Sequence, residues 1–464
     1  MQDENARQTR KGRGGETPKP TGPDGRPSRA RQRAVAIGVI GAVPAEGAEP
    51  LGELRELLLT AGVATVAEAT QVRPEPDPDR YLGRGKLAEI AELIKSSGAN
   101  LVACDDELAP RQERNLESEL GVPVIDRTAI ILDIFADHAN SAEGKLQVEL
   151  AQLEYNLARM RGLWTHLERL GAGVGVGGIG TRGPGESQIE TDRRLARDRI
   201  TALRRRLREV ERTRGVMRAQ RDASPVPKVA LAGYTNAGKS TLLNAMTGAG
   251  VGVGSRLFHT LDPTTRAYEW DGRRYLVTDT VGFIRKLPHS VVEAFKATLE
   301  ETNRADLVCH IVDASEPEPD RTSAIAAVDE VLKEIGADEL PRLIVYNKLD
   351  RLEPAERADL LVGRSGAVGI SAATGEGIDE LLAAIEVAFA ATLAPVELLV
   401  PYSEGAALSE LYDLGGDVER EERADGVFVQ ARIPLALAHR FARFDLSRTG
   451  PGSENGAARD ADAG

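Results

Sequence analysis

Short apolar runs alternate with amphipathic patterns of helical period along much of this chain. Between residues 34 and 137, runs such as AVAIGVI and ANLVACD are separated by patterns such as LGELRELLL and KLAEIAELI. Between residues 227 and 394, the runs KVALAG, YLVTDT, DLVCHIVDA, RLIVYN and AVGIS are separated in the same way. A strand followed by a helix, repeated, is typical of a mostly parallel sheet with helices on both faces. The pattern therefore predicts a multidomain α/β protein, with α/β domains over 34–140 and 225–394 and a small C-terminal α/β domain over 395–446.

Two long helices are predicted between the first two domains, over residues 141–224. Apolar residues of the first helix recur at steps of four and three, which is a seven-residue repeat. Such a repeat places an apolar seam along one side of the helix, and this seam must pack against another helix. We expect the second helix to begin at Ser187, because Ser187 and Glu190 match a capping box. Antiparallel pairing as a helical hairpin buries both seams. They consist of Leu146, Leu150, Leu153, Leu157, Met160, Trp164 and Leu167 in the first helix, and of Leu195, Ile200, Leu203, Leu207 and Val210 in the second.

A glycine-rich loop, GAGVGVGGIGTRGPG over residues 171–185, joins the two helices. Its eight glycines exclude regular structure. The loop matches G-x-G-x-x-G, a pattern of dinucleotide-binding sites, but it follows a helix rather than a strand. We reject that interpretation for this reason.

The 464 residues carry a net charge of −13, yet positive charge is concentrated in two segments. Residues 1–33 have a net charge of +5 and few large apolar side chains, so we expect a disordered basic tail there and a second disordered tail over 447–464. No apolar run reaches the roughly 20 residues needed to cross a bilayer. Cys104 and Cys309 lie in separate apolar runs, as buried thiols in a reducing compartment do, and we expect a cytoplasmic protein.

A phosphate-binding loop is predicted where the strand KVALA runs into G-Y-T-N-A-G-K-S and then into a helical segment. In such a loop backbone N–H groups wrap the phosphates at a helix N-terminus. Lys239 reaches the β- and γ-phosphate oxygens, and Ser240 is a candidate ligand of Mg²⁺. The candidate nucleotide-binding residues here are Gly233, Tyr234, Thr235, Asn236, Ala237, Gly238, Lys239 and Ser240.

Guanine recognition is predicted by N-K-L-D after the strand RLIVY, because a carboxylate at Asp350 accepts both hydrogens that guanine, unlike adenine, presents. The segment S-A-A after the strand AVGI is a weaker signal for N–H groups facing the guanine oxygen. The residues concerned are Asn347, Lys348, Leu349 and Asp350, and Ser371, Ala372 and Ala373.

Two further segments are expected to surround the γ-phosphate. In D-T-V-G, Asp279 supports the magnesium shell and the N–H of Gly282 senses the γ-phosphate, with Thr280 and Val281 between them. In L-F-H-T-L-D-P-T-T-R, Thr260 is our choice for the second magnesium hydroxyl, and Thr264 and Thr265 are the alternatives. We assign catalytic roles to Lys239, Thr260 and Gly282. The neighbours of Thr260 that we place at the nucleotide are Phe258, His259, Leu261 and Asp262.

The second long helix has an excess of arginine. Residues 192–221 carry a net charge of +8, and arginine pairs well with phosphate oxygens, so structured RNA is a plausible partner. A solvated helix face is the alternative. Arg182 places one further cation in the glycine loop. Aromatic residues make up only 4% of the chain, which argues against stacking on single-stranded bases.

Taken together, G-Y-T-N-A-G-K-S, T-L-D-P-T-T-R, D-T-V-G-F-I, N-K-L-D, S-A-A, G-G-I-G-T-R-G-P-G-E and Y-L-G-R-G-K resemble the HflX-type translational GTPases, relatives of the Obg group, over residues 34–445. The resemblance implies that the N-terminal domain and the hairpin engage the large (50S) ribosomal subunit and its rRNA, and in some members that stalled ribosomes are split. His259 departs from the family, in which we expect alanine. The resemblance to this family does not explain the basic N-terminal tail.

We therefore expect a monomeric, Mg²⁺-dependent GTPase that converts GTP to GDP and phosphate on the ribosome. Phe283 follows D-T-V-G where many small GTPases have a water-orienting glutamine, so hydrolysis by the chain alone should be slow unless another group, such as His259, positions the water. Two alternatives stay open: a nucleotide-gated RNA-binding assembly factor in which hydrolysis is incidental, and an ATP-driven RNA remodeller that uses G-R-G-K of the N-terminal domain.

Overall fold

The structure, a computed structural model, describes most of the chain and forms two compact units, the first ending at Arg127 and the second beginning at Thr128. The predictions for the two tails, the glycine loop, Arg182 and His259 fall outside the described residues, apart from the ends of these segments. The described residues are 32–43, 49–171, 184–222, 226–248, 250, 257–258, 260–288, 291–292, 295–362, 364, 366–390, 393–414 and 416–446.

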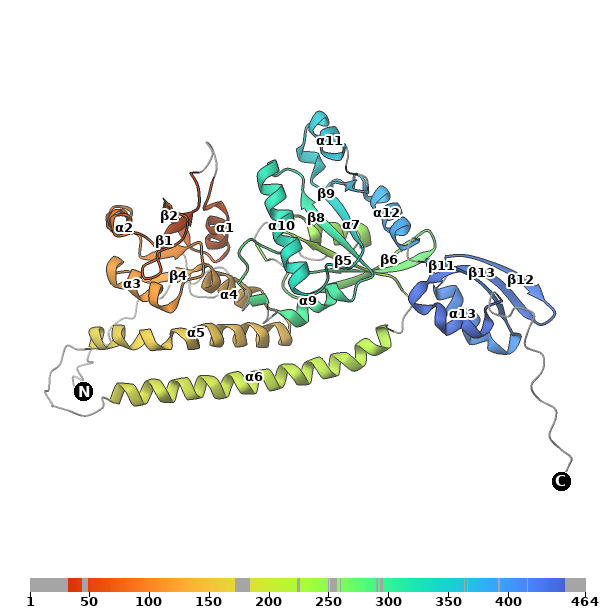
Figure 1. Cartoon of the computed structure of the whole chain (residues 1–464), viewed down its shortest axis with the longest axis horizontal. Helices are drawn as coiled ribbons and strands as arrows, with labels where there is room; N and C mark the ends of the chain where they lie inside the picture. The colour runs from red at the N-terminus through yellow and green to blue at the C-terminus, as the bar shows by residue number, and fades with distance from the viewer. Residues whose placement is uncertain are drawn as a thin grey trace, which may run out of the picture. The chain divides into compact units, whose positions relative to one another are not determined.

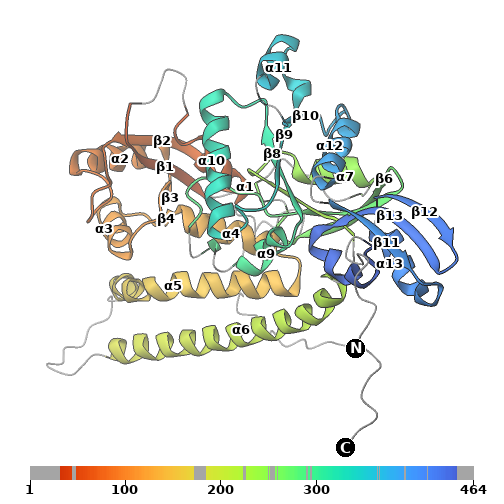
Figure 2. The same ribbon diagram turned by 45° about the vertical axis from the view of Figure 1, so that its right-hand side comes forward.

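The first unit is built on a four-stranded parallel sheet. Its elements are β1 (Arg33–Ile40), α1 (Gly52–Thr60), β2 (Ala64–Val72), α2 (Arg84–Ser97), β3 (Leu101–Cys104), α3 (Pro110–Leu120) and β4 (Val124–Asp126). The strand order is β2-β1-β3-β4 (Figures 1 and 2). Ile90 of α2 and Leu116 of α3 pack in one core with Val35 and Val102 of the strands. The alternation of apolar runs and helical patterns thus produced the expected parallel α/β layer.

The second unit begins with the helices α4 (Arg127–His138), α5 (Ala142–Gly171) and α6 (Pro184–Asp222). Helices α5 and α6 lie side by side and run in opposite directions (Figures 1 and 2). Their apolar seams meet, since Leu150 of α5 packs with Ile200 and Leu203 of α6. Two ion pairs also cross between the helices, from Arg199 to Glu149 at 2.6 Å and from Arg204 to Glu154 at 2.7 Å.

Helix α6 differs from its prediction at two points. It begins at Pro184, so Ser187 lies inside the helix and does not cap it. Proline suits the first turn of a helix, because its missing N–H would have no partner there. Leu195 is 59% exposed, whereas Ala196 is 6% exposed and occupies the seam in its place. The predicted face was therefore displaced by one residue at its start.

A six-stranded sheet forms the centre of the second unit. Its elements are β5 (Lys228–Gly233), α7 (Lys239–Thr247), β6 (Thr264–Trp270), β7 (Arg273–Asp279), α9 (Lys296–Asn303), β8 (Leu307–Asp313), α10 (Glu318–Glu334), β9 (Arg342–Asn347), α11 (Pro354–Leu361), β10 (Val368–Gly369) and α12 (Ile378–Ala390). The order is β10-β9-β8-β5-β7-β6, with only β6 antiparallel to its neighbour. Leu242 of α7 and Leu381 of α12 pack on one face, and Leu299 of α9 and Val328 of α10 on the other. This confirms a mostly parallel sheet with helices on both faces.

The described chain ends in a small antiparallel α/β region. Its elements are β11 (Leu393–Val400), a 3-10 turn (Tyr402–Glu404), α13 (Gly405–Leu414), β12 (Gly416–Arg423), β13 (Gly426–Pro434) and a 3-10 helix (Leu435–Phe444). The strand order is β11-β13-β12, and Leu411 of α13 packs on Leu398 and Val429. Across the described ranges, no helix combines the length and the apolar character that crossing a membrane requires.

Candidate functional site

The predicted phosphate loop connects the carboxyl end of β5 to the first turn of α7. Gly238 immediately precedes α7 and has a φ of +96°, a left-handed conformation that favours glycine. A Cβ atom on Gly238 would lie 2.2 Å from Nδ2 of Asn347, so the loop also needs glycine for space. The backbone at Asn236 is left-handed too, with a φ of +61°. These two positions fold the loop into a tight cradle.

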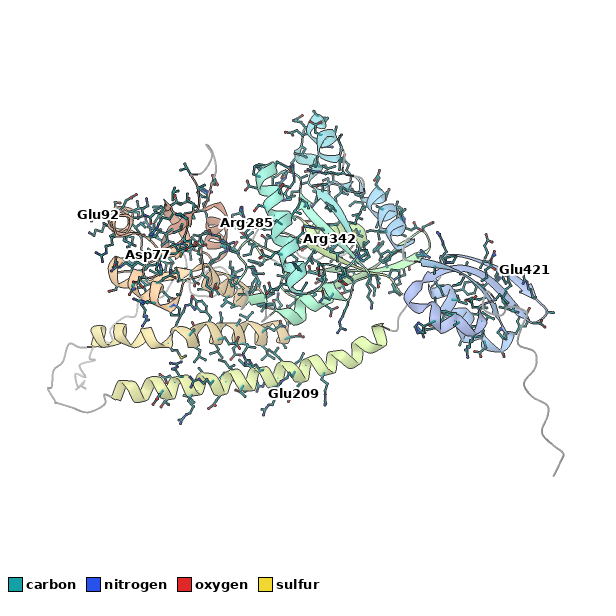
Figure 3. The ribbon with its side chains drawn as sticks, viewed as in Figure 1. Asp77, Glu92, Glu209, Arg285, Arg342 and Glu421 are labelled. Atoms are coloured by element: carbon teal, nitrogen blue, oxygen red, sulfur yellow. The ribbon has the colours of Figure 1, made fainter. Side chains whose placement is uncertain are left out.

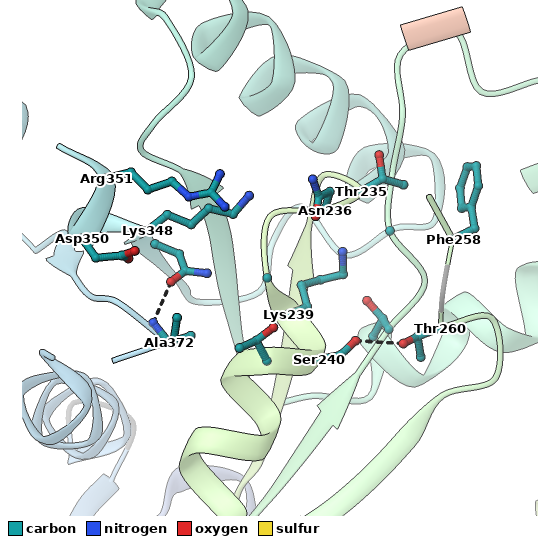
Figure 4. A pocket seen from close by; sticks show the side chains of 16 residues that line it. Thr235, Asn236, Lys239, Ser240, Phe258, Thr260, Lys348, Asp350, Arg351 and Ala372 are labelled. Atoms are coloured by element: carbon teal, nitrogen blue, oxygen red, sulfur yellow. Dashed lines mark hydrogen bonds between the residues drawn. The ribbon is translucent and has the colours of Figure 1, made fainter. Parts of the chain in front are cut away.

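A pocket opens over this loop, and segments far apart in the sequence line it (Figure 4). The predicted site residues that line it are Thr235, Asn236, Gly238, Lys239, Ser240, Phe258, Thr260, Thr280, Gly282, Asn347, Lys348, Asp350, Ala372 and Ala373. The structure adds Thr241 and Arg351, which directly follow two of the motifs and were missed. The predicted residues that do not line it are Gly233, Tyr234, Ala237, Leu261, Asp262, Asp279, Val281, Leu349 and Ser371.

Lys239 is folded into the cradle. Its ammonium group donates hydrogen bonds to the carbonyl oxygens of Gly233 and Tyr234, at 3.0 and 2.9 Å. Burial lowers the pKa of Lys239 to about 8, although the nearby carboxylate of Asp279 opposes this shift. The lysine thus bonds to neutral carbonyl groups, and a phosphate would supply a stronger, anionic partner.

Three oxygen-bearing side chains, those of Ser240, Thr260 and Asp279, meet next to Lys239. The hydroxyl oxygens of Ser240 and Thr260 lie 2.8 Å apart (Figure 4). The Ser240 hydroxyl also donates to Oδ2 of Asp279 at 2.6 Å. Oxygens are the ligands that Mg²⁺ prefers, and two adjacent ligands at roughly 2.1 Å from an octahedral ion lie about 3 Å apart. The spacing of Ser240 and Thr260 thus fits adjacent magnesium ligands. In the described part of the chain, no group of three or more His, Cys, Asp and Glu side chains has a metal-binding arrangement.

The two alternatives to Thr260 lie in the edge strand β6. Thr265 pairs its hydroxyl with that of Thr278 across the strand pair, at 2.9 Å. Thr264 starts the strand opposite Asp279 in the ladder, and neither threonine lines the pocket. Thr260 is therefore the threonine of this segment that the structure brings to Ser240.

The opposite end of the pocket carries the N-K-L-D and S-A-A segments. The side chain of Asn347 donates to the carbonyl of Ala237 at 2.7 Å and accepts from the N–H of Ala372 at 2.9 Å. Asp350 lines the pocket, and the Ser371 hydroxyl donates to its Oδ1 at 2.6 Å, which fixes the orientation of the carboxylate. Asn347 therefore connects three segments of the site, while Asp350 presents its carboxylate to the pocket.

The D-T-V-G segment approaches the phosphate loop closely. A Cβ atom on Gly282 would lie 2.9 Å from Cα of Thr235 and 3.1 Å from Nζ of Lys239, so a side chain does not fit there. Phe283 is 1% exposed and packs in the core with Val292 and other apolar residues. Its ring thus points away from the pocket, which leaves the phenylalanine unable to orient a water molecule.

Four family models match consecutive parts of the chain. Residues 48–136 match a GTP-binding GTPase N-terminal model, and residues 138–221 match a GTP-binding GTPase middle region. Residues 228–348 match a model described as a 50S ribosome-binding GTPase, and residues 357–449 match an HflX C-terminal domain.

Curated relatives match over most of their own length. A GTPase HflX of Caldanaerobacter subterraneus subsp. tengcongensis is 44% identical over 90% of this chain and 95% of the relative. A GTPase HflX of Escherichia coli K12 is 46% identical over 83% of this chain and 90% of the relative. Among solved structures, a GTP-binding protein from the archaeon Sulfolobus solfataricus in complex with GDP is 24% identical, with a TM-score of 0.39 over 77% of this chain and 98% of that chain.

Proposed function

Because the chain belongs to the HflX family of GTPases and hydrolyses GTP, we propose that it acts as a nucleotide-controlled switch on the ribosome, with the large (50S) subunit as its partner. The match of residues 228–348 to the model of a 50S ribosome-binding GTPase carries this proposal. The process served is translation, through ribosome splitting and rescue or through ribosome biogenesis. A ribosomal partner implies the cytoplasm, and we expect the chain to act there as a monomer.

Phosphate binding in this proposal falls to the loop and Lys239. The lysine leaves its two carbonyl partners for the β- and γ-phosphates, which are stronger acceptors because they are charged. Ser240 and Thr260 would hold Mg²⁺, with Asp279 behind Ser240. When bound, the metal stabilises negative charge on the phosphate oxygens. The absence of a side chain at Gly282 leaves its N–H free to approach the γ-phosphate.

Guanine selection is assigned to Asp350. Its carboxylate is held by Ser371 and can accept from both hydrogen-bond donors of guanine. The N–H of Ala372 is bonded to Asn347, so within the S-A-A segment the N–H of Ala373, another lining residue of the pocket, is assigned to the guanine oxygen. Asn347 contributes by holding these segments together, since both ends of its side-chain amide are used within the protein.

RNA binding is assigned to arginines on the outer side of α6. Arg199 and Arg204 are ion-paired with α5 and serve to join the helices. At 100° per residue, another set of exposed arginines lies opposite the buried seam, and side chains project from this side of the helix (Figure 3). We call this set the outer arginine stripe: Arg194, Arg205 and Arg212.

The proposal is tested by cosedimentation with purified 50S subunits under GDP and under a non-hydrolysable GTP analogue, together with single-turnover GTP hydrolysis. We expect binding to favour the analogue. Hydrolysis should accelerate on the subunit by roughly 10³- to 10⁵-fold, as when a partner completes a GTPase site in trans, because Phe283 cannot position the water. Fast hydrolysis by the chain alone, without a further increase on 50S subunits, contradicts the switch on the ribosome.

Charge reversal of Arg194 and Arg205 to Glu should weaken 50S binding and reduce its salt slope by about 2, with GTP affinity unchanged. Reversal of Arg420 and Arg423 in β12 makes the same change in net charge outside the hairpin and serves as the control. Nucleotide-dependent 50S binding without acceleration would support the assembly factor instead. ATP hydrolysis that survives Lys239→Ala would support the RNA remodeller.

A further inference from the structure

Asp262 does not line the nucleotide pocket, and its carboxylate instead accepts three hydrogen bonds from the residues that precede α5. Its Oδ2 accepts from the backbone N–H groups of Asn140 and Ser141, at 3.1 and 2.8 Å. The hydroxyl of Ser141 donates to its Oδ1. These donors immediately precede α5, so the carboxylate lies at the N-terminal end of the long hairpin helix, where the helix dipole favours negative charge.

The first turn of α5 is shaped to receive this carboxylate. A Cβ atom on Gly144 would lie 2.8 Å from Oδ1 of Asp262 and 3.0 Å from Oγ of Ser141. The N–H of Gly144 donates to the same Ser141 hydroxyl at 2.8 Å. Gly144 is thus the residue that leaves room for Asp262, and Ser141 links the carboxylate to the helix backbone.

A second attachment lies four residues earlier in the same segment. Nδ1 of His138, the last residue of α4, is 2.7 Å from the carbonyl oxygen of Phe258. The ring of Phe258 meets that of Phe135 edge-on, with centroids 4.7 Å apart, and Phe135 in turn contacts Phe295. Phe258 has a φ of +55°, which a bulky residue adopts only when its surroundings hold it there.

Thr260 lies midway between these two attachments, with its hydroxyl 2.8 Å from Ser240. We propose that His138 and Asp262 are positioning residues: they hold Phe258 and Asp262 on either side of Thr260, so that Thr260 reaches the metal side of the pocket. The junction of α4 and α5 thereby senses the bound nucleotide. In GTPases the γ-phosphate and its metal order such a segment, and hydrolysis releases it. Loss of the γ-phosphate would then also loosen Asp262 from α5.

The coupling is reciprocal, because a contact that favours the triphosphate state is itself favoured by the triphosphate. A partner that holds the hairpin in this arrangement would strengthen triphosphate binding without touching the pocket. The inference requires only that the chain binds GTP and GDP, so its test is independent of the ribosomal proposal.

The first test compares affinities for a non-hydrolysable GTP analogue and for GDP, each with Mg²⁺, by fluorescent-nucleotide titration. Asp262→Ala and Gly144→Ala should each lower the analogue-to-GDP affinity ratio about tenfold while GDP affinity stays constant. Gly85→Ala is the matched control, because Gly85 also lies in the first turn of a helix but has open space around its Cβ position. An unchanged ratio in both test variants overturns the proposal.

The second test needs no variant. Hydrogen exchange of the Asn140 and Ser141 amides, which donate to Asp262, should be at least tenfold slower with the analogue than with GDP in the wild-type chain. Equal protection in both nucleotide states would make the contact a permanent joint and would overturn its role in sensing the nucleotide.

Discussion

Nucleotide binding should be accompanied by proton uptake at Lys239. In the free protein, burial lowers the pKa of this lysine to about 8. Bound phosphates add a strong anionic partner, which favours the ammonium form and returns its pKa toward the ordinary value of about 10.4. At pH 8 about half of the free chains carry a neutral lysine while nearly all nucleotide-bound chains carry a charged one, so each GDP should take up about 0.5 proton.

The direction of the pH dependence follows from the same shift. Raising the pH stabilises the free protein with neutral Lys239 relative to the complex, so binding weakens as the pH rises through 8. Between pH 7 and pH 8.5 the affinity for GDP should fall about fourfold, and the proton uptake should rise from about 0.1 to about 0.75. Below pH 7 both free and bound lysines are charged, and this dependence disappears.

Isothermal titration calorimetry measures the uptake directly. Titrations with GDP at pH 8 in two buffers of different ionisation enthalpy should give apparent enthalpies that differ by the uptake multiplied by the difference in ionisation enthalpy. Lys239→Arg is the control, because a guanidinium stays charged at this pH and removes the uptake. Identical enthalpies for the wild type in both buffers would refute the argument, since they would mean that Lys239 is already fully charged when no nucleotide is bound.

Two further predictions concern other buried or recognition residues. Asp350→Asn should weaken GTP binding by roughly 10- to 100-fold and shift preference toward xanthine nucleotides, which present a carbonyl in place of guanine's amino group; unchanged GTP affinity in a titration would remove Asp350 from base recognition. His310 is 1% exposed, and burial, with the charges of Arg342 and Lys239, lowers its pKa to about 3 despite a carboxylate oxygen of Asp329 at 3.9 Å. In the unfolded chain, His310 therefore takes up a proton near pH 6.5, whereas in the folded chain it stays neutral. Stability is lost as the pH falls from 6.5 toward 3. In urea unfolding, the wild type should lose about 2 kcal/mol more than His310→Gln between pH 7.5 and pH 5, and equal losses would show that the folded imidazole titrates normally.

The parts of the fold that the sequence predicts well are those set by local order. The apolar run KVALAG predicts a strand over residues 228–233, and β5 has these bounds, because a buried parallel strand is a continuous apolar run ended by the phosphate loop. The start of α6 is predicted less well: the capping signal at Ser187 competes with the preference of Pro184 for a first turn, and the proline prevails. Within the seam, Leu195 is the more apolar residue, but the spacing of Ile200 and Leu203 selects Ala196.

The candidate site divides in the same way. Each of its motifs is a contiguous run of residues, so the sequence alone names them, and the fold brings most of them to one pocket. The contacts of Asp262 with Asn140 and Ser141 could not be predicted, since they join positions more than 120 residues apart and depend on how α5 lies against the sheet. The sequence places Asp262 beside the nucleotide because Thr260 is there, whereas its side chain turns the other way.

Asn347 and Asp350, the two motif residues at the guanine end of the pocket, differ in how strongly they are bonded to the phosphate loop. Asn347 is bonded to the phosphate loop through Ala237 and to the S-A-A segment through Ala372. Its side chain therefore connects the base-binding region directly to the phosphate-binding region. Asp350 is held by Ser371, which belongs to the base-binding end, so it can be exchanged without disturbing the phosphate loop. A designer who wishes to change the base while keeping the triphosphate chemistry therefore has one modular position, Asp350, and one that is shared by both tasks, Asn347.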